Sequence, residues 1–222
     1  MMDADTLLAA LGHDWVVEAR AEVARRPDAI VRHFAAARRR IGRAPLPGAP
    51  GWAADEAARA VLLAALPPAE LPALLETLYE HGSAEEKHAI LRALPLLPLG
   101  GEAVPLLRDA VRTNDPRLVT AALGPYARHL DQAAWRQAVL KCVFMGVPLA
   151  GIDDLDGRAD AELTGMLAGL AEERTAAGRT MPSDAVDLLR RLTRPRDPGA
   201  AGPDGNGAVG AAGGPGIVGR EA

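Results

Sequence analysis

The chain has 222 residues, 49% of them hydrophobic, which suffices for one domain that buries roughly 70% of the surface of its unfolded chain. Its 25 Lys and Arg stand against 29 Asp and Glu, and a net charge of −4 disfavours nucleic acid and anionic membrane surfaces as partners. Three Trp, two Tyr and two Phe leave the core to aliphatic helix faces, and the single cysteine, Cys142, excludes an internal disulfide and fits a reducing compartment.

Two helices and a loop are predicted at the N-terminal end. Apolar residues recur near helical spacing from Thr6 to Ala24, and a second helix starts at Pro27 and ends at Ile41, so the two form a helical hairpin. The stretch Ala44 to Gly51 contains three prolines and two glycines and is interpreted as an ordered loop, with Trp52 docking its far end. Acidic residues stand where a secretory signal would be basic, and no run of about 18 apolar residues occurs, which favours a cytoplasmic protein without a transmembrane helix.

Short helices separated by Pro or Gly are predicted after this loop. Ser83 and Glu86 have the spacing of a capping box, which starts a helix. The segment Leu74 to Gly82 aligns with Leu106 to Asn114 at an offset of about 32 residues, which resembles a degenerate two-helix repeat. Each helix pair would bury its apolar face only against its neighbours. The predicted fold is therefore all-α, made of stacked short helix pairs as in HEAT repeats or an α-solenoid, with an irregular bundle as the alternative.

Three further helices are predicted in the second half of the chain. Asp131 is the N-cap of the first, Asp160 to Ala177 is an amphipathic helix, and Ser183 to Leu192 is the last. The Gly-, Pro- and Ala-rich segment that follows cannot bury enough apolar area to offset the cost of ordering its backbone. We therefore expect an α-helical domain at 1–193 and a disordered tail at 194–222.

No motif with a catalytic or metal-binding spacing occurs, so the sequence predicts no catalytic residue, no metal site and no cofactor. Cys142 beside Lys141 could form a reactive thiolate, but burial as a small apolar residue is favoured. Aromatic and charged residues near predicted helix ends could instead converge on one groove, although ion pairs and core packing would also explain them. These candidates for binding a ligand or partner are Tyr126, Trp135, Lys141, Arg158, Glu162, Arg174 and Arg179.

Several stretches of the chain resemble one known family. They are Trp135 to Leu149, Glu162-Leu163, Glu173-Arg174 and Gly178-Arg179, and further upstream Gly51-Trp52 and Pro125-Tyr126. Together they are similar to the EboA family of metabolite traffic proteins. The resemblance leaves out the extreme N-terminus and the tail.

The resemblance implies membership of a gene set that also encodes a prenyltransferase-like membrane protein, a hydrolase-like protein, a cyclase resembling dehydroquinate synthase and a sugar isomerase-like protein. We therefore expect a non-catalytic helical-repeat component of secondary metabolism. Its partners would be a pathway metabolite or other proteins of the same gene cluster, with contact to the membrane prenyltransferase as one option. The alternative is an enzyme acting on a prenyl or phosphorylated cyclitol-type substrate, in which Lys141, Arg158 and Arg179 hold an anionic group. A DNA-binding helical repeat would need a basic concave face, which the acidic balance argues against.

Overall fold

The computed structural model describes residues 2–194. This part of the chain forms twelve α-helices and four short 3-10 helices, and its only β-type pairing is an isolated bridge between Pro45 and Ala53. The prediction of an all-α fold is therefore confirmed. The predicted tail lies outside the described residues, except for Arg194.

The N-terminal hairpin contains one helix more than predicted. The helices are α1 (Ala4–Leu11), α2 (Asp14–Arg25) and α3 (Ile30–Ile41). The prediction of one continuous helix from Thr6 to Ala24 is wrong because Gly12 adopts a left-handed conformation, with φ of 54°, and ends α1. The next residue, His13, restarts the chain as an N-cap, since its side chain accepts a hydrogen bond from the Trp15 amide at 3.2 Å.

Helix α4 (Ala54–Ala64) lies at the centre of the first half and contacts α1, α2, α3 and α6. All of its residues from Ala54 to Leu63 are buried, including three charged ones. Arg59 donates to the Asp55 carboxylate at 2.8 Å and to the Phe34 carbonyl at 3.1 Å, which satisfies this charge inside the core. Because α4 is enclosed, it holds the N-terminal hairpin against the helices that follow.

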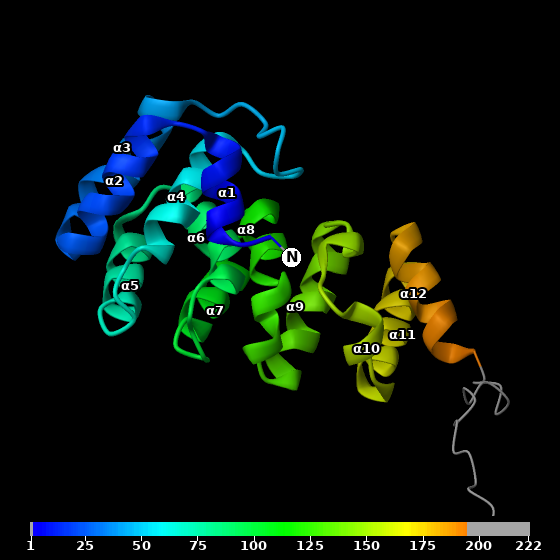
Figure 1. The fold of residues 1–222 in the computed structure, drawn as a ribbon. Helices are drawn as coiled ribbons and strands as arrows, with labels where there is room; N and C mark the ends of the chain where they lie inside the picture. The colour runs from blue at the N-terminus through cyan, green and yellow to red at the C-terminus, as the bar shows by residue number, and fades with distance from the viewer. Residues whose placement is uncertain (1, 195–222) are drawn as a thin grey trace, which may run out of the picture.

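The next five helices alternate between two layers. They are α5 (Leu71–His81), α6 (Ala84–Ala93), α7 (Val104–Arg112), α8 (Pro116–Ala122) and α9 (Gln132–Met145). Helix α6 contacts α4 and α8, whereas α5 packs on α6, and α7 and α9 pack on α8. Figure 1 shows these helices following one another in chain order from the N-terminal hairpin toward the C-terminal end of the described chain. The two segments that align in sequence lie in α5 and α7, and the likeness to HEAT repeats stays a prediction.

The predicted helix ends in this region are set by local hydrogen bonds. Ser83 and Glu86 form the expected capping box, with the Ser83 amide donating to the Glu86 carboxylate at 2.9 Å. Asp131 and Asp160 accept from the amides three residues on, at 2.8 and 3.0 Å. The predicted capping box and the predicted N-cap at Asp131 are confirmed, whereas Asp160, expected as the first residue of the next helix, is its N-cap.

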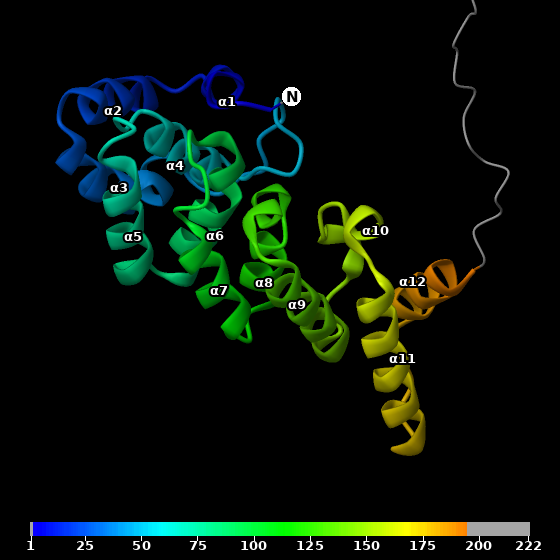
Figure 2. The same ribbon diagram turned by 90° about the horizontal axis from the view of Figure 1, so that it is seen from below.

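The C-terminal end consists of α10 (Leu155–Arg158), α11 (Ala161–Ala176) and α12 (Ser183–Thr193). Helix α11 packs on α9 and on α12, and in Figure 2 its far end extends away from the body of the molecule. None of the helices in residues 2–194 combines the length and the apolar character that crossing a membrane would require.

Candidate functional site

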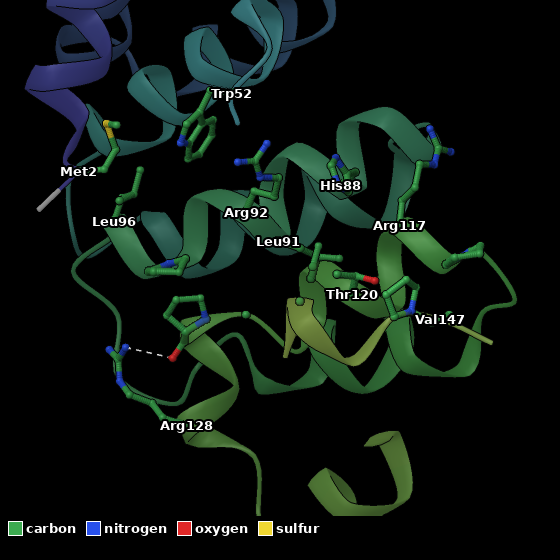
Figure 3. Close-up of a pocket in the computed structure, with 17 residues that line it drawn as sticks. Met2, Trp52, His88, Leu91, Arg92, Leu96, Arg117, Thr120, Arg128 and Val147 are labelled. Atoms are coloured by element: carbon green, nitrogen blue, oxygen red, sulfur yellow. Dashed lines mark hydrogen bonds between the residues drawn. The ribbon is translucent and has the colours of Figure 1, made fainter. Parts of the chain in front are cut away.

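An open pocket with a volume of about 860 Å³ lies beside α6 and α8, and Figure 3 shows the residues around it. Small-molecule sites commonly have volumes of roughly 300–1,000 Å³. The turns after α6 and α8 and the loop after α9 complete its walls, while Trp52 and Met2 reach it from the N-terminal part of the chain. The apolar lining residues are Met2, Trp52, Leu91, Pro95, Leu96, Pro116, Ala121, Pro125, Val147 and Pro148.

Prolines shape much of this wall because they stand where helices begin or end. Pro116 and Pro125 occupy first-turn positions of α8 and of the 3-10 helix Pro125–His129, and Pro95 and Pro148 follow the ends of α6 and α9. Proline has a fixed φ and no backbone N–H, so it is tolerated at such positions and brings no hydrogen-bond donor. The prolines therefore give this part of the wall a restricted backbone and an apolar surface.

A cluster of four side chains joins the Trp52 loop to α6 at one wall. The Arg92 guanidinium lies over the Trp52 ring, 4.2 Å from its centroid. The same guanidinium donates to the Glu56 carboxylate and to the Gly51 carbonyl, each at 2.7 Å. His88 Nδ1 lies 3.0 Å from the other Glu56 oxygen. Since His88 and Arg92 are four residues apart on α6, they reach the same carboxylate from one helix face.

Glu56 is the anion of this cluster. Burial alone would raise the pKa of its carboxyl group, but the hydrogen bond to His88 and the charge of Arg92 outweigh burial and lower the pKa from 4.5 to about 2. Glu56 is therefore ionised at neutral pH and compensates the charge of Arg92.

Two further arginines lie at opposite ends of the pocket, as Figure 3 shows. Arg117 donates to both oxygens of Asp115, at 3.2 and 2.8 Å, and lies 3.8 Å from Glu85. Arg128 donates to the Pro125 carbonyl at 3.3 Å and forms no ion pair with any of residues 2–194. None of the lining residues is Asp or Glu, and Arg128 is the one lining arginine without an ion pair to residues 2–194.

The lining residues suit binding better than covalent chemistry. Apart from the arginines, which stay protonated in proteins, the polar side chains in the lining are His88 and Thr120. His88 is already engaged by Glu56. Across residues 2–194, His, Cys, Asp and Glu side chains form no group of three or more that could hold a metal ion. The arrangement can bury an apolar body and attract a negative charge.

The residues predicted from the sequence lie outside this pocket. Tyr126 is buried, and its hydroxyl donates to the Gly100 carbonyl at 2.6 Å. Trp135 is fully buried and has the Arg158 guanidinium 4.7 Å from its ring centroid. Arg158 also donates to the Ala127 and Leu130 carbonyls, at 2.7 and 3.0 Å. The structure thus brings Trp135 and Arg158 together, in a contact that closes the turn before α9.

The other four candidates are dispersed. Lys141 donates to the Val111 and Thr113 carbonyls at the end of α7, each at 2.7 Å. Glu162 pairs with Arg136 at 2.6 Å, Arg174 donates to the Thr180 and Phe144 carbonyls, and Arg179 is exposed. The structure does not gather them into one groove. Their role in binding stays a prediction.

Cys142 is completely buried on α9. Burial raises the pKa of its thiol to about 11, and the charge of Lys141 offsets this only in part. A thiolate nucleophile is therefore disfavoured, and the predicted burial is confirmed.

The sequence analysis did not select the pocket residues His88, Arg92, Arg117 and Arg128. Two features of the sequence point to this region: His88 and Arg92 lie four residues apart in a predicted helix, and prolines stand at four helix ends. Neither signal identifies a pocket without knowing that α6 and α8 lie side by side.

One comparison with known proteins gives a match. Residues 32–190 match the family described as Metabolite traffic protein EboA. No curated protein and no solved structure matches the chain significantly. The matched range contains every residue that lines the pocket except Met2.

Proposed function

This chain belongs to the EboA family of metabolite traffic proteins, and we propose that it binds a small metabolite in the pocket beside α6 and α8 without transforming it. The observation that carries the proposal is the lining itself. The pocket is large enough for a small molecule, its lining is mostly apolar, and proline rings restrict the backbone of its wall. The energy of binding would come from burial of apolar ligand surface, about 25 cal/mol for each Å² removed from water.

A role in carrying rather than converting the metabolite is supported by the polar residues of the lining. Nucleophilic and general acid–base catalysis use a reactive group placed beside a second group that activates it. The lining contains no Asp, Glu, Cys, Ser, Lys or Tyr, and the Thr120 hydroxyl makes no hydrogen bond to His88. Other proteins of the same gene cluster would therefore transform the metabolite. This protein would exchange its ligand with them in the cytoplasm.

Binding of a neutral apolar probe tests this proposal. N-phenyl-1-naphthylamine fluoresces strongly in apolar surroundings, so titrating it with the purified full-length protein measures saturable binding. Ala121→Phe adds a ring to the pocket wall, whereas the matched control Ala133→Phe adds the same ring to an exposed position on α9. We expect Ala121→Phe to weaken binding by about tenfold or more, equivalent to about 1.4 kcal/mol, and Ala133→Phe to leave it unchanged.

Two outcomes would contradict the proposal. One is that the wild-type protein shows no saturable probe binding, or that both variants bind like the wild type although their melting temperatures show that they fold. The other is that the purified protein alone converts a pathway intermediate, which would make it an enzyme.

A further inference from the structure

The charges around the pocket differ from those of the protein as a whole. The chain has more acidic than basic residues, 29 against 25. The lining nevertheless contains His88, Arg92, Arg117 and Arg128 and no carboxylate. Because a partly enclosed apolar site screens charges less than open water does, a lining cation that no carboxylate compensates favours an anionic ligand over a neutral or cationic one.

The four basic side chains are not equally available to such a ligand. Glu56 already compensates Arg92 and contacts His88, and Asp115 with Glu85 compensates Arg117. Arg128 differs because its one hydrogen bond goes to the neutral carbonyl of Pro125. A guanidinium has five N–H donors in a planar fork, so Arg128 has several left for the two oxygens of a carboxylate or phosphate.

The position of Arg128 indicates how an anionic ligand would be oriented in the pocket. In Figure 3 it lies at one end of the pocket, below Leu96 and Met2, and Arg117 lies at the other. Leu91 lies between these ends in Figure 3, and the lining also includes Pro95 and Ala121, which offer apolar contact. A ligand that carries charge along its whole length would be poorly matched to this middle section, since its polar groups would lose water without gaining partners.

Resting on the proposed function above, we infer that the metabolite is an amphiphile with one anionic headgroup held by Arg128 and a hydrocarbon body lying along the apolar wall toward Thr120 and Val147. A carboxylate and a phosphate share the chemistry that Arg128 recognises, because both present two oxygens to the guanidinium fork.

The test compares ligands that share one hydrocarbon chain and differ in the headgroup. Dodecanol, dodecanoate and dodecyl phosphate, each below the concentration at which it forms micelles, compete with N-phenyl-1-naphthylamine for the full-length protein. We expect both anions to bind at least about tenfold more tightly than dodecanol. The tighter of the two anions indicates whether the natural headgroup is a carboxylate or a phosphate.

Arg128 variants test the assignment. Arg128→Gln should reduce the preference for the anions to within about threefold of dodecanol while leaving dodecanol binding unchanged, and Arg128→Lys should keep part of the preference. Arg112→Ala, which removes an exposed arginine of α7 outside the pocket lining, is the matched control and should bind like the wild type. Melting temperatures of all variants show whether each is folded.

The outcomes separate this inference from the proposed function. If dodecanol competes as well as the two anions, or if Arg128→Gln keeps the full preference, the inference is overturned and the proposed function stands. If N-phenyl-1-naphthylamine itself does not bind, the proposed function fails and this inference fails with it.

Discussion

Replacing Arg158 by Ala tests whether this arginine stabilises the fold or binds a ligand. Its guanidinium donates to the Ala127 and Leu130 carbonyls and to the Gln132 side chain, at 2.7, 3.0 and 3.2 Å, and covers the Trp135 ring. These contacts tie α10 to the turn that precedes α9. Truncation would leave two carbonyl groups without their charged donor.

The size of the effect follows from these contacts. A hydrogen bond to a charged group contributes about 1.5–3 kcal/mol, and a cation–π contact contributes about 0.5–2 kcal/mol. Such contributions are not additive, and water reaches part of the guanidinium, so we expect a loss of about 3 kcal/mol rather than the full sum. In a domain of this size each kcal/mol lowers the melting temperature by about 2–4 °C, which gives a decrease of about 6–12 °C.

Urea denaturation and probe binding measured on the same samples check this expectation. Arg179→Ala is the control, because that side chain is exposed and makes no hydrogen bond or ion pair within the described structure, and its stability should change by less than about 0.5 kcal/mol. Arg158→Ala should be destabilised and, below its melting temperature, still bind N-phenyl-1-naphthylamine. If it instead kept the stability of the control and lost the probe, Arg158 would be a binding residue and the pocket beside α6 and α8 would be the wrong site.

Three other expectations follow from buried ionisable groups. Asp55→Ala leaves the buried Arg59 charge unpaired and should cost about 3–5 kcal/mol in urea denaturation, whereas Asp187→Ala removes an exposed pair and should cost less than about 1 kcal/mol; similar losses would refute this account. Because the pKa of Glu56 is lowered from 4.5 to about 2, its ionised carboxylate stabilises the fold at pH values above 4.5, and this contribution is lost as the pH falls toward about 2. Between pH 4.5 and 2 the free energy of unfolding of the wild type should therefore fall by up to about 3 kcal/mol more than that of Glu56→Gln. Parallel pH profiles of the two proteins would contradict this expectation. Cys142 should react with a thiol reagent at pH 8 only after unfolding, because the thiol is buried and its pKa is about 11, and rapid labelling of the folded protein would disprove this.

Helix ends were the part of the fold that the sequence predicted best, because a cap is a contact between residues close in the chain. Ser83 with Glu86, and Asp131 with the amide three residues on, form these hydrogen bonds between residues close in the chain. The end of α1 at Gly12, which the sequence analysis did not predict, also depends on residues close in the chain. Apolar spacing on both sides of it suggested one helix, but a glycine can take the left-handed conformation that ends a helix at low cost.

The candidate site was not predictable in the same way. Lys141 and Arg158 are of the residue types expected in a binding groove. They instead donate their hydrogen bonds to backbone carbonyls at helix ends and turns about thirty positions away in the chain, such as those of Val111 and Ala127. Arg92 in turn reaches Glu56 and the Trp52 ring only because α4 and α6 pack together.

By itself the sequence determined the class of fold, several helix ends such as those at Ile41, Ser83 and Asp131, and the family, because helical periodicity, capping residues and prolines act within a few neighbours. Only the tertiary structure decided which charges compensate one another and which lining arginine has no carboxylate partner among residues 2–194. The physical reason is that the pairing of a side chain depends on distance in space: Asp115 compensates Arg117, while Arg128 lies at the end of the pocket with a carbonyl as its partner.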